Sequence, residues 1–181
     1  ADFETVLKKD LAKAGNEKRF AKDKKFWDDQ LDALGEPLYS DIQGPSVLEE
    51  ARKRHGNPKL RSSDIEMKDL FVAVKDYYLE PGPTKNLIDF CMNHQLSMTN
   101  LLLLGIRTYL SKVNNGQEDI TIQNFISRRS THDEWTSGGS RTIMFPCRTV
   151  IAPETDFLSA AYEIQNMQNR IYMHSNYDPA L

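Results

Sequence analysis

The sequence contains only two cysteines, Cys91 and Cys147, among its 181 residues. Two cysteines cannot build the disulfide framework of a small secreted domain, and nothing pairs them as metal ligands. No apolar run, the leucines at residues 101–104 included, approaches the roughly 20 residues of a membrane helix, and the N-terminus lacks a signal pattern. We therefore expect a cytoplasmic protein without a membrane span or a metal site, in which both cysteines are structural.

Positively and negatively charged residues are nearly balanced in the sequence. Lys and Arg number 23, and Asp and Glu number 26, which gives a formal net charge of −3 at pH 7. Without a Lys/Arg block to neutralise phosphates, the sequence argues against a nucleic-acid-binding protein. Hydrophobic residues make up 39% of the chain, enough to bury a core, and the length suits one domain of ordinary size.

The common catalytic and nucleotide-binding motifs are also missing. The sequence has no G-x-G-x-x-G, G-x-x-x-x-G-K-[ST], H-E-x-x-H, C-x-x-C or G-x-S-x-G pattern. His174 and Asp178 do have the H-x-x-x-D spacing of many acyltransferases, in which the histidine handles a proton, but Pro179 follows where those enzymes have glycine. The turn at residues 138–140 either offers backbone N–H groups to an anion or simply precedes a strand.

Hydrophobic spacing and turn residues predict a mixture of helices and strands. We expect helices at residues 3–14, 17–34, 47–54, 85–95, 98–113 and 156–175, and strands at 70–74, 119–123 and 143–147. Apolar residues surround nearly the whole helix at 98–113, so we expect it to be buried on most sides, against the strands at 70–74 and 120–122. The predicted fold class is α/β, a mixed sheet with packed helices.

Two arginines, Arg129 and Arg148, lie just after a predicted strand or at the end of one. An arginine in such a place either pins a loop through bidentate hydrogen bonds or faces solvent. The spacing alone leaves both possibilities open.

Several segments taken together resemble the condensation domain of nonribosomal peptide synthetases. They are the F-W-x-x-x-L run at residues 26–31, the capped leucine-rich helix, and the strand at residues 119–122 that leads to Arg129. Members of this family carry the pattern D-[VI]-x-[IV]-G-x-P-V-x-x-R. Here Gln123 and Phe125 replace the glycine and the proline, and Arg129 matches the final arginine.

Further motifs of the family follow in the same order. The pattern [IV]-G-x-F-V-N-T-L-x-x-R overlays residues 138–148, where Gly139 and Arg148 agree with it. The pattern [HN]-Q-D-[YV]-P-F is approximated by His174, Tyr177 and Pro179 with one extra residue, and residues 1–3 resemble the end of a Y-x-D-F segment. The resemblance thus covers most of the chain and implies motif or substrate-channel positions for Arg129, Gly139, Arg148, His174 and Tyr177.

The resemblance implies a two-lobed fold like that of chloramphenicol acetyltransferase and the formation of a peptide bond. Residues 1–40 would be a helical segment bridging to an N-terminal lobe, and residues 41–181 an incomplete C-terminal α/β lobe. The family's catalytic signature H-H-x-x-x-D-G is absent from these residues, so we expect no catalytic residue among them and no activity from them alone.

The partners implied by the resemblance are peptidyl carrier proteins and neighbouring synthetase domains. Phosphopantetheine would arrive on the carriers, and the chain itself would bind no cofactor directly. Surfaces that normally face the other lobe would be exposed, so we expect the isolated residues to self-associate. Two alternatives remain: an acyltransferase of the same fold that uses coenzyme A, and a non-catalytic module that docks carrier proteins.

Overall fold

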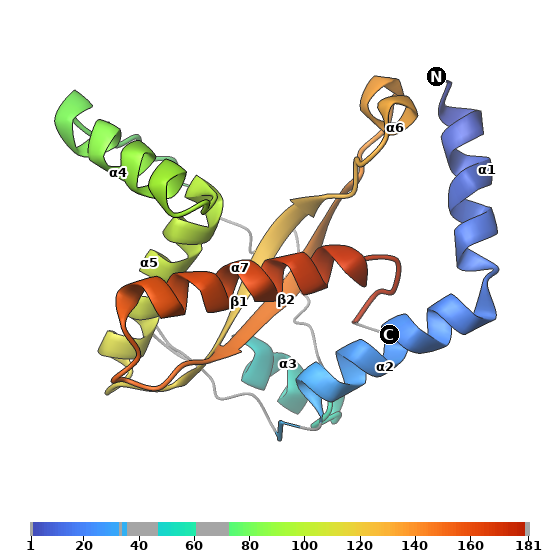
Figure 1. The fold of residues 1–181 in the computed structure, drawn as a ribbon. Coiled ribbons are helices and arrows are strands. Elements are labelled where there is room, and N and C mark those ends of the chain that lie inside the picture. Colours follow the sequence, from blue (N-terminus) through green and yellow to red (C-terminus); the bar gives the residue numbers. More distant parts are fainter. Residues whose placement is uncertain (1, 33, 36–46, 61–72, 180–181) are drawn as a thin grey trace.

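The computed structural model describes every residue except 1, 33, 36–46, 61–72 and 180–181. Along the described residues, five helices come before the first strand, and each strand is followed by a helix (Figure 1). In order they are α1 (Phe3–Ala14), α2 (Glu17–Leu31), α3 (Val47–His55), α4 (Pro81–Asn93), α5 (Met98–Val113), β1 (Asp119–Ser127), α6 (His132–Thr136), β2 (Thr142–Val150) and α7 (Phe157–Met173).

Side-chain caps explain where several helices begin. The Ser97 side chain accepts a hydrogen bond from the backbone N–H of Asn100, which starts α5 at the predicted residue. Two predicted starts were wrong. The helix α7 is capped by Asp156 rather than Thr155, and α4 begins at Pro81, four residues before the predicted start. Proline suits the first turn of a helix because the N–H that it lacks would have no partner there.

The strands β1 and β2 pair antiparallel, with Asp119 opposite Val150 and Ser127 opposite Thr142. The helix α7 lies across one face of this two-stranded sheet, and α5 contacts both α7 and β1 (Figure 1). Both strands extend beyond the predicted ranges because the register continues for nine residues on each side. The predicted fold class, α/β with packed helices, is confirmed, and the sheet in the described part of the chain is antiparallel.

Two hydrophobic clusters hold the elements together. The first joins α4, α5 and α7, and its members include Leu104, Ala161 and Ile164. The second joins α2 to the sheet and to the end of α7. Here the Trp27 ring stacks on that of Phe145, with 5.3 Å between ring centroids. Such aromatic pairs add to the free energy gained by burying their apolar surface.

Two expectations about α5 and its surroundings were wrong. The outer side of α5 is exposed at Leu102, Ile106 and Tyr109, because α4, α7 and β1 cover only part of the circumference. Of the strand predicted at 70–74, residues 70–72 lie outside the described residues. Ala73 and Val74 are not in a strand, and no strand in the described part of the chain is hydrogen-bonded to them.

Among the described residues, no helix combines the length and the apolar character that crossing a bilayer requires. Both cysteines are buried and free. Burial raises the pKa of the Cys147 thiol to about 11, against the opposing effect of a hydrogen bond with Gln168, so this thiol stays protonated at neutral pH.

Candidate functional site

The loop of residues 128–141 connects β1 to β2 and is called the connecting loop below. It contains α6, a single helical turn that the hydrophobic spacing of the sequence did not predict. The Thr131 side chain accepts a hydrogen bond from the Glu134 backbone N–H at 3.3 Å, and the Glu134 carboxylate accepts one from the Thr131 N–H at 3.0 Å. This reciprocal pair is a capping box, and the T-x-x-E spacing at residues 131–134 was the signal that could have revealed it.

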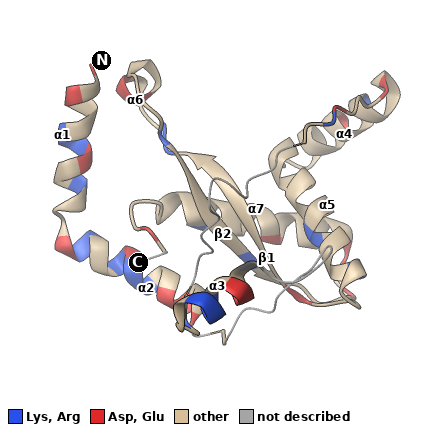
Figure 2. Cartoon of the chain, turned by 180° about the vertical axis from the view of Figure 1, so that it is seen from behind, with Lys and Arg blue, Asp and Glu red and all other residues tan. Residues whose placement is uncertain are grey.

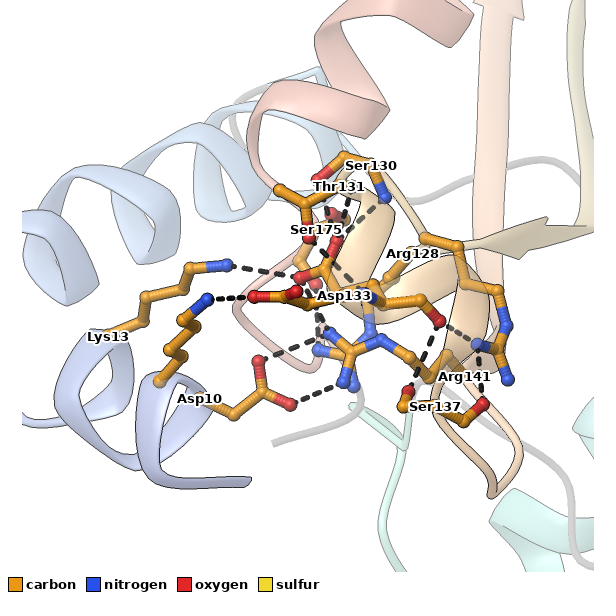
Figure 3. A network of polar contacts seen from close by, with 12 residues as sticks. Asp10, Lys13, Arg128, Ser130, Thr131, Asp133, Ser137, Arg141 and Ser175 are labelled. Carbon is orange, nitrogen blue, oxygen red and sulfur yellow. Dashed lines mark hydrogen bonds and ion pairs between the residues drawn. The ribbon is translucent and has the colours of Figure 1, made fainter. Parts of the chain in front are cut away.

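The Glu134 carboxylate is the centre of a buried polar network, and its partners Ser130, Thr131 and Arg141 are labelled in Figure 3. One of its oxygens accepts from the backbone N–H of Ser130 at 2.7 Å and from the Ser130 hydroxyl at 2.9 Å. The other lies 3.3 Å from Arg141 Nη2 and 3.5 Å from Lys13 Nζ. Burial by itself would raise the pKa of Glu134, but the hydrogen bonds from Ser130 and Thr131 and the charge of Lys13 outweigh it and lower the pKa to about 2.

Helix α1 contributes to the same network (Figures 1 and 3). Asp10 accepts two hydrogen bonds from the Arg141 guanidinium, at 2.6 and 3.1 Å, and Lys9 Nζ lies 2.5 Å from Asp133. The hydrogen bonds from Arg141 hold the pKa of Asp10 below its ordinary value of 3.8. No motif in the sequence pointed to Asp10 or Arg141, because these residues are separated by 131 positions.

Arg129 pins the far side of the connecting loop. Its guanidinium donates to the carbonyl oxygens of Glu134, Ser137 and Gly139, at 3.1 Å for Ser137 and 2.6 Å for Gly139. Of the two possibilities left open by the sequence, Arg129 therefore takes the loop-pinning one. The carbonyl of Gly139 is engaged by Arg129, and the residue has a φ of +84°.

Replacing Gly139 with alanine should lower the free energy of unfolding by about 1–2 kcal/mol, because side chains are strained at positive φ. A Cβ added there would also lie 3.0 Å from Cε2 of the Phe3 ring. Urea unfolding would measure the loss. Gly138 is the matched control, since a Cβ at that position meets no atom within 4 Å and its φ is not positive. Equal losses in Gly138→Ala and Gly139→Ala would contradict this account.

Arg148 lies in β2, away from the connecting loop, and joins the sheet to the end of α2. Its guanidinium binds the Asp119 carboxylate through two hydrogen bonds, at 2.9 Å from Nε and 2.5 Å from Nη2. Nη1 also donates to the backbone carbonyls of Gln30 and Gly35, at 3.2 and 2.9 Å. These hydrogen bonds satisfy backbone carbonyls at the end of α2, which stops at Leu31, three residues before the predicted end.

His174 ends α7, and the carboxylate that it contacts belongs to α2. Its Nδ1 lies 2.8 Å from Oδ1 of the buried Asp23, and its ring stacks on Phe26 with 4.2 Å between centroids. Its backbone carbonyl accepts a hydrogen bond from Trp27 Nε1 at 3.1 Å. These contacts make His174 part of the α2–α7 interface, and no sequence pattern had pointed to Asp23.

The predicted site residues fall into three places. Arg129 and Gly139 meet in the connecting loop, His174 and Tyr177 lie at the α2–α7 interface, and Arg148 joins β2 to α2. Tyr177 is buried, with its ring 5.1 Å from that of Phe20. In the described part of the chain, no group of three or more His, Cys, Asp or Glu side chains is arranged to hold a metal ion. The contacts of these residues stabilise the fold and fix the shape of its loops.

The sequence matches the family model of the condensation domain over residues 7–179, and the chain therefore belongs to the condensation domain family. The resemblance found in the sequence motifs is thereby confirmed. In a curated relative, one of the plipastatin synthase proteins of Bacillus subtilis (strain 168), 160 residues are 22% identical to this chain. They cover 88% of this chain and 5% of that protein.

Solved structures share the fold. The first condensation domain of the calcium-dependent antibiotic synthetase, in complex with substrate analogue 2a, superposes with a TM-score of 0.70 and 15% identity, covering 96% of this chain and 35% of that one. Another structure of the first condensation domain of the CDA synthetase gives a TM-score of 0.69, with 34% of its chain covered. The chain thus spans about a third of these structures.

Proposed function

We propose that the chain is part of a condensation domain that joins aminoacyl or peptidyl groups in a nonribosomal peptide synthetase. The amine of the acceptor attacks the carbonyl carbon of the donor thioester, the C–S bond breaks, and the donor carrier is left with a free thiol. The family match over residues 7–179 is the observation that carries this proposal. Phosphopantetheine would be supplied on the carrier proteins, which with the neighbouring synthetase domains are the proposed partners.

The proposed division of labour gives this chain a scaffolding role. Residues 1–40 would bridge to an N-terminal lobe, and residues 41–181 would form much of the C-terminal lobe and one wall of the substrate channel. The sequence lacks the H-H-x-x-x-D-G motif, which supports the proposal that the catalytic histidine belongs to another part of the polypeptide. The apolar side chains of Leu102, Ile106 and Tyr109 are exposed on one side of α5. This exposure supports a contact between α5 and another part of the synthetase, and it supports self-association of residues 1–181 when they are produced alone.

The network at the connecting loop supports a role for Arg129 and Gly139 in shaping that wall. A loop held by Arg129 and Glu134 keeps one conformation, and fixed walls are what hold an amine and a thioester in a reactive geometry. The contacts of Arg148, His174 and Tyr177 would keep α2 and α7 in place behind it.

The test is reconstitution of the full-length polypeptide with a loaded donor carrier and a loaded acceptor carrier. Mass spectrometry of the carrier-bound species should show a new amide on the acceptor and a free thiol on the donor. Product formed only from an acyl-coenzyme A donor would replace the proposal with the coenzyme A-dependent alternative. Binding of carriers without any product would favour the non-catalytic docking module.

Substituting His174 with asparagine should leave amide formation within about threefold of the native rate, because His174 supports an interface and handles no proton in this proposal. Asparagine also occurs at this position of the family motif, and it can still hydrogen-bond with Asp23. The rate would be measured under saturating carriers, together with thermal unfolding. A loss of 100-fold or more with unchanged unfolding would instead make His174 a catalytic residue, as the H-x-x-x-D spacing suggested.

A further inference from the structure

Helices α1 and α2 are anchored in different ways. In α1 only Val6 is buried, and its apolar residues Phe3, Leu7 and Leu11 are 52%, 42% and 63% exposed. In α2, by contrast, Phe26 and Trp27 lie in a hydrophobic cluster. The packing of side chains that fixes α2 is thus largely lacking for α1.

Ionic contacts take the place of that packing. Three charged residues in the C-terminal half of α1 bind the connecting loop: Lys9 to Asp133 at 2.5 Å, Asp10 to Arg141 at 2.6 Å, and Lys13 to Glu134 at 3.5 Å. Figures 1 and 2 show α1 and α6 side by side in views from opposite sides. Val6 is the one buried residue of α1, and the Phe3 ring lies beside Gly139.

The α1 side of each pair is open to solvent, whereas the connecting loop is held together internally. The side chains of Lys9, Lys13 and Asp10 are 53%, 39% and 32% exposed, so dissolved ions can screen them. Glu134 keeps its hydrogen bonds with Ser130 and its contact with Arg141 without any help from α1. Loss of α1 would therefore leave the connecting loop folded.

The joint between the helices is short. Only Gly15 and Asn16 separate α1 from α2, and Asn16 caps α2 by accepting a hydrogen bond from the Arg19 N–H at 3.0 Å. A change of backbone angles at these two residues is enough to swing α1 while leaving α2 intact.

We propose that α1 is a detachable strap: ionic contacts hold it on the connecting loop, and when they are screened or broken it swings away about Gly15 and Asn16 while α2 and the sheet remain folded. Detachment uncovers the Arg141 and Glu134 side chains, which are 8% and 4% exposed when α1 is in place. The strap thereby decides whether this charged pair is accessible. The proposal does not depend on the reaction that the domain performs.

Hydrogen exchange measured by mass spectrometry on the full-length polypeptide tests the strap. The helical amides of α1 should exchange about tenfold faster in 1 M than in 0.05 M NaCl, as expected if three partly exposed ion pairs lose most of their attraction. The amides of α2 and α7 should not change. Unchanged exchange of α1 would overturn the proposal, and so would a loss of protection shared equally by α1, α2 and α7.

A pair of double variants separates the strap from a general effect of lost charge. Lys9→Ala/Lys13→Ala removes two contacts with the connecting loop, and α1 should then exchange rapidly even at low salt. Alanine is the best helix former, which offsets the loss of the favourable position of Lys13 in the last turn of α1. The matched control is Lys24→Ala/Lys25→Ala, which removes two lysines that form ion pairs with Asp28 and Asp29 of the same helix α2. If both double variants speed α1 equally, the strap is refuted.

Discussion

Replacing Arg148 with alanine should lower the free energy of unfolding by about 3–5 kcal/mol, because a buried charge pair would lose one partner. Asp119 would lose both of its hydrogen bonds from the guanidinium, and the carbonyls at the end of α2 would lose their donor. A positive charge at the C-terminal end of a helix is also favourable in itself, since the helix dipole is negative there. Urea unfolding followed by circular dichroism would measure the loss.

Two companion variants make this result interpretable. Arg148→Lys keeps the charge but cannot donate two parallel hydrogen bonds to the carboxylate, so its free energy of unfolding should fall by about half as much. The lysine variant should therefore stay folded even if the alanine variant unfolds. Arg170→Ala removes an arginine whose guanidinium lies 5.0 Å from the Phe26 ring centroid on the exposed side of α7, and it should cost about 1 kcal/mol or less. Similar losses for Arg148→Ala and Arg170→Ala would show that Arg148 does not join the sheet to α2.

The sequence predicted well those helix ends and strands that are determined by residues close together in the chain. The start of α5 at Met98 follows from a cap formed within three residues, and the end of α1 follows from Gly15. The strands at residues 119–123 and 143–147 were found from their apolar alternation, because β-branched residues spaced by two fit one face of a sheet.

Features that depend on distant residues were missed or wrong. The exposure of Ile106 and Tyr109 depends on which elements cover α5, and helical periodicity does not reveal that. The same holds for the sites. An arginine at position 148 could either hold a loop through hydrogen bonds or face solvent. The sequence could not decide between these, because the backbone carbonyls that Arg148 binds are more than 110 positions away. Asp23 became visible as the partner of His174 only in the folded chain, where α2 and α7 meet.

Acid should weaken the fold through Glu134, whose pKa is about 2 in the folded chain against an ordinary value of 4.5. A carboxylate with a lowered pKa contributes its full stabilisation above pH 4.5 and loses it as the pH falls towards 2. Over that interval the loss amounts to about 3 kcal/mol. Glutamine is uncharged at every pH, so Glu134→Gln should be less stable than the native protein at pH 7, and the difference should shrink steadily below pH 4.5.

The measurement is a series of urea unfolding curves from pH 7 down to pH 2.5 for the native protein and the variant. Subtracting one from the other isolates Glu134, because Asp10 and Asp133, whose pKa values are also lowered, are present in both. Glu163→Gln is the matched control on the exposed face of α7, and its difference from the native protein should stay within about 0.5 kcal/mol. A Glu134→Gln difference that does not vary with pH would show that hydrogen bonding to Ser130 and Thr131 depends on the shape of this side chain, not on its charge.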